Sequence, residues 1–184
     1  MGLFDFFKKK EPHYDSTNIR VNDLDVGFVF EYDLSTWVVN AIMEYDWGDN
    51  YFTREFQITN GSETRFLGIE DDDELSISLM QKVKIRALKD DLTDTLIANQ
   101  QPPKKITYKG ITYYLEKESP GYFHNITKGG EWEEFRSWDF EDEEGKHLLC
   151  IEQWDEKEFE ASIGISVQEF EISNILPGED QQTK

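Results

Sequence analysis

The chain has 184 residues, with 39 acidic side chains against 19 basic ones and a formal net charge of −20. Such a field repels a phosphate backbone, so we expect no nucleic acid partner. A content of 38% hydrophobic and 14% aromatic residues is enough for a buried core, in one domain or two small fused ones. The single cysteine, Cys150, lies in an apolar run and fits a reducing compartment, which predicts a cytoplasmic protein.

Residues 1–18 predict a short amphipathic helix followed by a linker. Apolar side chains share one side of this helix and lysines close its C-terminal end: Leu3, Phe4, Phe6, Phe7, Lys8, Lys9 and Lys10. A helix this short is marginal alone and needs a surface to lie on. The alternatives are an anionic membrane surface, a protein partner and this protein's own sheet.

Residues 19–87 predict a first β unit. Runs with the composition or alternation of strands occur at 28–32, 36–45, 52–58, 66–70, 75–79 and 82–86. Asn60-Gly61 marks a hairpin turn. Residues 88–105 then change to helical spacing and end in a proline pair, which predicts one short connecting helix and a linker.

Residues 106–177 repeat the plan of the first unit, ahead of a polar tail at 178–184. The segment that begins at Arg54 matches the one that begins at Arg136, and the segment from Phe66 matches the one from Leu148. Both shifts are 82 positions (136 − 54 and 148 − 66). Strands are expected at 111–115, 122–127, 132–140, 148–153, 159–163 and 167–172, with Pro120-Gly121 as a turn.

The predicted fold class is therefore all-β, with about ten to twelve strands at this spacing. Two repeated antiparallel meanders pack as a sandwich, or as two small half-barrels, with pseudo-two-fold symmetry. Because a single meander would leave an apolar face bare, we expect the two copies to cover each other's apolar faces.

Two equivalent arginines and two equivalent glutamates are the first candidate binding residues: Arg54 with Arg136, and Glu70 with Glu152. Hairpin loops of five residues would place each arginine opposite its glutamate, whereas four-residue loops would place an isoleucine there. The alternatives are a structural charge pair at the rim of the core and a clamp for a carboxylate or phosphate, which suits the planar guanidinium.

Trp47 and Trp154 are the other candidate binding residues, because both lie in acidic turns. An exposed tryptophan beside acids marks a binding rim, and packing over the end of a sheet is the alternative. Trp37 and Trp138 alternate with apolar neighbours and are expected in the core. The sequence carries no catalytic motif and no histidine pair at metal-ligand spacing, so we expect no enzyme, no metal and no cofactor.

Several segments resemble the uncharacterised bacterial family known as domain of unknown function 4178: residues 1–10, 45–50, 54–56, 159–162 and 170–172. The resemblance covers most of residues 27–177 and brings no catalytic signature. The resemblance implies a genomic association with small membrane proteins and with phage-shock-type membrane-stress proteins in bacteria.

Two functions follow from these observations. The first is a non-enzymatic protein-interaction or scaffold module that docks peripherally at the inner membrane face. Its partner is another protein, and a membrane-associated partner is one alternative. The alternative is a small-molecule or lipid binding protein with a pocket between the two β units. A pocket of several hundred cubic ångströms lined by both units favours the binder, and a filled interior favours the scaffold.

Overall fold

The structure is a computed structural model that describes residues 14–178. Within them, eleven antiparallel strands form one sheet. The strands are β1 (Val29–Tyr32), β2 (Ser35–Asp46), β3 (Phe52–Thr59), β4 (Thr64–Asp71), β5 (Leu75–Val83), β6 (Lys105–Tyr108), β7 (Ile111–Asn125), β8 (Glu133–Glu141), β9 (His147–Asp155), β10 (Glu158–Val167) and β11 (Ser173–Leu176). The helices are α1 (Ile85–Leu88) and α2 (Leu92–Asn99), and the 3-10 turns are η2 (Val21–Asp23) and η3 (Glu169–Glu171).

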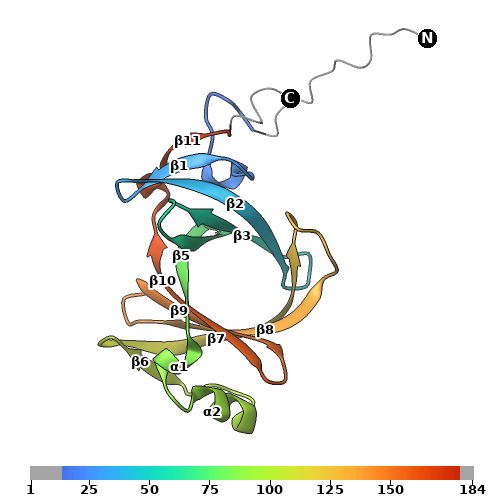
Figure 1. Cartoon of the computed structure of the whole chain (residues 1–184), viewed down its shortest axis with the longest axis vertical. Helices are drawn as coiled ribbons and strands as arrows, with labels where there is room; N and C mark the ends of the chain where they lie inside the picture. The colour runs from blue at the N-terminus through green and yellow to red at the C-terminus, as the bar shows by residue number, and fades with distance from the viewer. Residues whose placement is uncertain (1–13, 179–184) are drawn as a thin grey trace, which may run out of the picture.

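Eight of the strands close into a ring (Figure 1). The order in the sheet is β11-β1-β2-β3-β4-β5-β10-β9-β8-β7-β6, and a further pairing of β2 with β7 closes it. The first half of the ring is β2 to β5 and the second is β7 to β10. The all-β prediction is confirmed for the described residues, whereas the expected helix at residues 1–10 lies outside them.

The two halves are related by the predicted pseudo-two-fold axis. Gln81 pairs with Ile163 where β5 meets β10, and Met43 pairs with Asn125 where β2 meets β7. Both pairs are 82 positions apart (163 − 81 and 125 − 43), which is the shift of the sequence repeat. Equivalent residues that face each other across antiparallel strands lie on a two-fold axis, so the axis passes through both seams.

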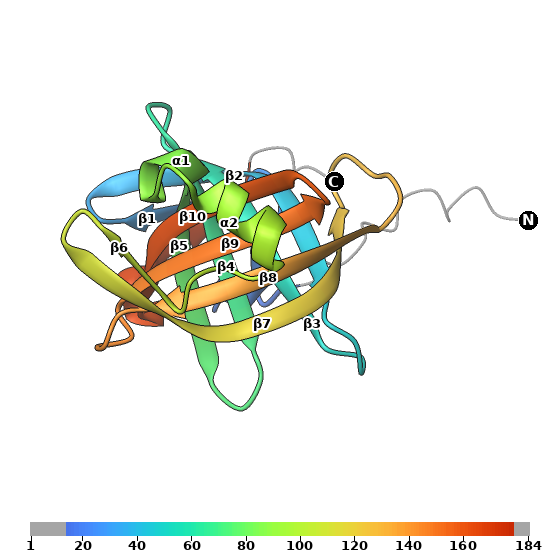
Figure 2. The ribbon, with the colours of Figure 1, turned by 90° about the horizontal axis from the view of Figure 1, so that it is seen from below.

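The larger apolar faces of the two halves point outward, and the halves cover each other only through a smaller apolar cluster inside the ring. Phe56 on β3 packs in a core with Leu24 and Phe28, from the segment that lies outside the ring. Its equivalent Trp138 on β8 packs in a separate core with Leu92 of α2. Figure 2 shows α1 and α2 across the outer face of the second half. Each half therefore has its own cover on the outside. Ring closure turns the opposite faces inward, and these carry polar residues beside a small apolar cluster around Tyr45 and Phe135.

Three further expectations about single elements are corrected. Residues 75–83 form one strand, β5, where two strands at 75–79 and 82–86 were expected. The expected connecting helix is α2, and a further helix, α1, precedes it. Residues 167–172 are not a strand of their own, because β10 ends at Val167 and η3 follows. The expected turn at Pro120-Gly121 lies within the long strand β7.

The strand continues through Pro120 because β7 has a partner on only one side there. Pro120 pairs with Arg136 of β8, while pairing with β2 begins at Tyr122. The missing N–H of proline therefore costs no ladder hydrogen bond on the open side. At Gly121, a Cβ atom would lie 3.0 Å from Cε3 of Trp47, so glycine allows the end of β2 to approach closely.

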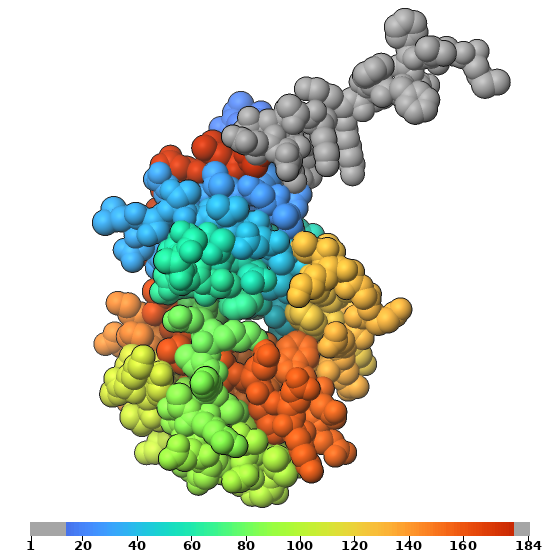
Figure 3. Space-filling view, viewed as in Figure 1, coloured from blue at the N-terminus to red at the C-terminus, as the bar shows by residue number. Residues whose placement is uncertain are grey.

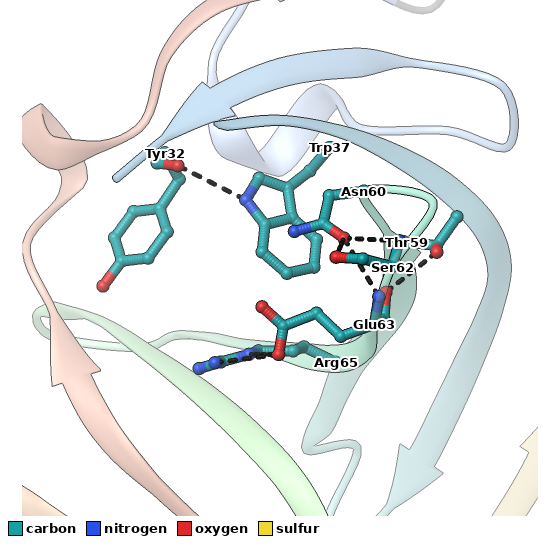
Figure 4. A network of polar contacts seen from close by, with 7 residues as sticks. All are labelled: Tyr32, Trp37, Thr59, Asn60, Ser62, Glu63 and Arg65. Carbon is teal, nitrogen blue, oxygen red and sulfur yellow. Dashed lines mark hydrogen bonds and ion pairs between the residues drawn. The ribbon is translucent and has the colours of Figure 1, made fainter. Parts of the chain in front are cut away.

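A four-residue loop joins β3 to β4, and Asn60 holds its shape (Figure 4). The Asn60 Oδ1 atom accepts hydrogen bonds from the backbone N–H groups of Ser62 and Glu63, both at 3.0 Å. Such an asparagine turn fixes the loop length. The resulting register places Arg54 opposite Ile69, as expected for a loop of four residues. Among residues 14–178, no helix is long and apolar enough to cross a membrane.

Candidate functional site

The interior of the ring holds two adjoining cavities of about 480 and 520 Å³. Residues of both halves line each cavity, and Tyr45 and Glu55 line both. The larger cavity reaches toward the β4–β5 and β8–β9 turns, and the smaller one toward the β9–β10 turn. Viewed down the ring, the space-filling surface shows a small opening at the centre (Figure 3).

Aromatic side chains form one wall of this interior, beside the seam of β2 and β7. Tyr45 stacks on Trp47 with ring centroids 5.8 Å apart, and Phe135 stacks on Trp154 at 5.1 Å. Phe123 meets Trp154 edge-on, also at 5.1 Å. Two of these rings, Trp47 and Trp154, were candidate rim residues. Both are half-buried in this wall, where they offer flat apolar surface.

Carboxylates and one lysine face the aromatic wall. The Nζ atom of Lys82 lies 3.3 Å from an oxygen of Glu152 and forms a second ion pair with Glu160. The hydroxyl of Tyr45 donates a 3.0 Å hydrogen bond to Glu55. Among the described residues no ion pair involves Glu55. Glu55 is thus the acid of this group that makes no ion pair, although the charge of Lys82 acts on it.

Burial and neighbouring charges shift the protonation of this group. Burial raises the pKa of Glu55 to about 7, and the charge of Glu152 adds to the effect. Burial by itself would lower the pKa of Lys82, but Glu152 and Glu160 outweigh it and raise that pKa to about 12. Lys82 therefore stays charged, while Glu55 exchanges its proton near neutral pH.

Three buried polar atoms at the cavities have no hydrogen-bond partner among the described residues: Ser119 Oγ, Ser137 Oγ and Trp154 Nε1. Ser119 and Ser137 pair across β7 and β8, and they are only 6% and 2% exposed. Ser137 lies near Asp139, a carboxyl whose pKa is raised by burial, but its hydroxyl makes no hydrogen bond of normal geometry. A buried polar group without a partner costs about 1–3 kcal/mol, so a water molecule or a ligand in the cavity that pairs with these atoms would be favoured.

The two equivalent arginines do not pair with the candidate glutamates. The register places Arg54 opposite Ile69 and Arg136 opposite Gln153. Each arginine forms an exposed ion pair with a glutamate of the neighbouring strand, at 3.8 and 3.3 Å: Glu44 on β2 and Glu118 on β7. Exposed pairs of this kind contribute about 0–1 kcal/mol.

The two equivalent glutamates point into the ring. Glu70 and Glu152 both line the larger cavity. Glu70 accepts a hydrogen bond from the Tyr51 hydroxyl, and Glu152 pairs with Lys82. The structure therefore brings the candidate glutamates and the candidate tryptophans to one interior. Arg54 also lines the larger cavity, whereas Arg136 lines neither cavity.

The sequence did not single out Glu55, Lys82 or Ser119. Glu55 alternates with the apolar residues of β3, so its face was expected to be wet. The signal that would have found it is the duplication: if both copies turn their apolar faces outward, their polar faces must meet.

Comparisons with known proteins give a family but no solved structure, since none matches this chain. An "uncharacterized protein" of Aquifex aeolicus (strain VF5) is 32% identical over 184 residues, which is 96% of this chain and 99% of the relative. Residues 25–169 match the family model described as "Domain of unknown function (DUF4178)", a range that includes all eight strands of the ring. The chain therefore belongs to the DUF4178 family.

Proposed function

We propose that this protein binds a small organic molecule inside the ring, between its two halves. The observation that carries the proposal is the pair of adjoining cavities, about 480 and 520 Å³, lined from both sides. Small-molecule sites are typically about 300–1,000 Å³, with apolar and aromatic walls and a few convergent polar groups. The aromatic wall, the buried serines and the carboxylates supply those features.

The free-energy cost of the unpaired polar groups inside the ring supports a ligand-binding role rather than a scaffold role. Each half already has its own apolar core on the outside, around Phe56 and around Trp138. The fold therefore does not need an interior in which the half-buried Glu55 makes no ion pair and Ser119 is buried without a partner. Unfavourable groups of this kind are typically retained where function uses them.

A filled cavity tests the proposal. Ser78 on β5 lines the larger cavity, so Ser78→Phe places a ring inside it. Ser173→Phe, on the exposed strand β11 outside the ring, adds the same group elsewhere as the matched control. A mixed set of neutral, anionic and cationic aromatic fragments is screened by ligand-observed NMR against the wild-type chain and both variants.

We expect fragments that bind the wild type and the Ser173→Phe control but lose at least about tenfold in affinity, about 1.4 kcal/mol, on Ser78→Phe. Circular dichroism and thermal unfolding establish that the Ser78→Phe chain is folded. Fragments that bind all three proteins equally, or a screen without hits, would contradict binding inside the ring.

A further inference from the structure

We infer that the ligand carries a positively charged nitrogen on an aromatic body, and that this nitrogen pairs with Glu55 in exchange for a proton. The inference rests on the proposed function, because it specifies the chemistry of a molecule held inside the ring. In the exchange the cation enters, the proton of the Glu55 carboxyl leaves to solvent, and the total charge of the site is unchanged.

The charge of the cavity walls selects a cation. The smaller cavity is lined by five acidic residues and one basic residue, Lys82. The larger cavity is lined by six acidic residues and two basic ones. A concave site with low-dielectric walls of one charge sign concentrates ions of the opposite sign and repels carboxylates and phosphates.

The one lysine that lines the smaller cavity is already engaged. Lys82 pairs with Glu152 and Glu160, and its Nζ atom lies 5.6 Å from the centre of the Phe66 ring. It shows that this interior holds a cation between carboxylates and an aromatic face. Glu55 feels the charge of Lys82 but makes no ion pair with it, and its hydrogen bond comes from the neutral Tyr45 hydroxyl. It is therefore the carboxylate left for a cation from outside.

The aromatic side chains beside Glu55 suit an organic cation. Tyr45, Phe123 and Trp154 line the same smaller cavity as Glu55. An ammonium group over such rings gains about 0.5–2 kcal/mol when it is desolvated. A second observation is independent of the acids: Trp154 Nε1 and Ser119 Oγ are buried without partners. They can hydrogen-bond to a polar group elsewhere on the ligand.

Few groups that face Glu55 change their charge near neutral pH. The facing groups come from four strands: Tyr45 on β2, Lys82 on β5, Cys150 and Glu152 on β9, and Glu160 on β10. Burial raises the pKa values of Tyr45 and Cys150, so both stay neutral. Burial also raises the pKa of Glu152, which Lys82 opposes. Glu55, with a pKa of about 7, therefore changes its charge between pH 5.5 and 8.5, and the Glu55→Gln variant isolates its share of the response.

Three matched probes test the inference on the full chain: 2-phenylethylamine, 2-phenylethanol and 3-phenylpropionate, which are cationic, neutral and anionic. Isothermal titration calorimetry gives each dissociation constant at about pH 5.5 and 8.5. We expect the amine to bind at least about tenfold more tightly than the alcohol at the higher pH. At the lower pH the amine competes with the proton of the Glu55 carboxyl, whose pKa is about 7. This competition weakens the affinity for the amine by up to about 30-fold.

Two variants locate the effect. Glu55→Gln keeps the shape of the protonated side chain and removes its charge, so the preference for the amine and its pH dependence should both disappear. Glu74→Gln changes a carboxylate in the exposed β4–β5 turn and should leave both unchanged. Titrations of the amine in two buffers of different ionisation enthalpy should detect about half a proton released at about pH 7.

The outcomes separate this inference from the function on which it rests. If the alcohol binds as tightly as the amine, or if the carboxylate binds best, the cation inference is overturned while binding inside the ring stands. The same holds if the amine does not bind but other fragments are displaced by Ser78→Phe. If no fragment depends on the open cavity, both are overturned.

Discussion

Met43 lies opposite Asn125 where β2 meets β7, and the two residues occupy equivalent positions of the two halves. Gln81 and Ile163 show the same relationship at the other seam. The halves therefore meet twice with related geometry, and neither leaves an unpaired strand edge at the seams. The cavities follow from this closure, since each half supplies one wall and neither encloses a space alone.

The β2–β7 seam depends on a hydrogen bond beyond its last strand pair. The backbone N–H of Ile42 donates to Thr127 Oγ1 at 2.8 Å. Thr127→Val removes this acceptor and leaves the N–H group unpaired, so the free energy of unfolding should fall by about 1–2 kcal/mol. Urea unfolding measures the loss. Thr36→Val, at an exposed position of β2, is the control, and an equal effect of both changes would contradict this account of the seam.

The β5–β10 seam depends on a glycine. A Cβ atom at Gly164 would overlap the backbone carbonyl oxygen of Leu79, which cannot move without disturbing the strand pairing. Gly164→Ala should therefore cost about 3 kcal/mol of unfolding free energy or prevent folding. At Gly68 the added Cβ would meet only the Ser78 hydroxyl closer than 3 Å, and that group can rotate. Gly68→Ala should cost about 1 kcal/mol or less, and similar thermal unfolding of both variants would refute the distinction.

The duplication was readable from the sequence because Arg54 and Arg136, like Phe66 and Leu148, are separated by the same shift. Strand positions followed from alternation, and the expected core positions of Trp37 and Trp138 are confirmed, at 3% and 0% exposure. These features are local: a period of two and a repeat do not depend on how the sheet curves.

Which face of the sheet becomes enclosed in the ring could not be predicted from the sequence. Alternation separates Glu55 from Phe56 without saying which of them faces the axis of a ring. Closure at the β2–β7 seam decides this, and the pairing joins residues about 80 positions apart in sequence. The position of Arg54 relative to Glu70 depends on a single residue of loop length, which the hydrogen bonds of Asn60 determine.

Membrane docking through residues 1–10 stays a prediction from the sequence. Their removal should abolish co-flotation with anionic vesicles, because four apolar side chains and three lysines are lost together. The fold should survive, since the deletion ends before Tyr14, which packs edge-on against Phe28 at 5.3 Å. Replacing the three lysines with glutamine separates charge from apolar contact. Equal flotation of the full-length and shortened chains would remove the docking hypothesis.

Glu55 also makes stability depend on pH. Its pKa rises from an ordinary value of 4.5 to about 7 in the folded protein, so between these values the folded state binds more protons than the unfolded chain. The free energy of unfolding contributed by this group therefore falls as pH rises from about 4.5 to about 7, and it is constant above that range. At about 1.4 kcal/mol per pKa unit the full shift corresponds to roughly 3 kcal/mol, which partial exposure to solvent reduces to about 1–2 kcal/mol.

Glu55→Gln removes this penalty while its amide oxygen still accepts the hydrogen bond of the Tyr45 hydroxyl. The variant should therefore match the wild type in urea unfolding near pH 4.5 and exceed it by about 1–2 kcal/mol near pH 8. The other titrating groups are common to both chains and cancel in the difference, and Glu74→Gln should show no such trend. A stability difference that is the same at both pH values would mean that Glu55 is already ionised in the folded ring, and the proton exchange proposed for its ligand would then have no proton to release.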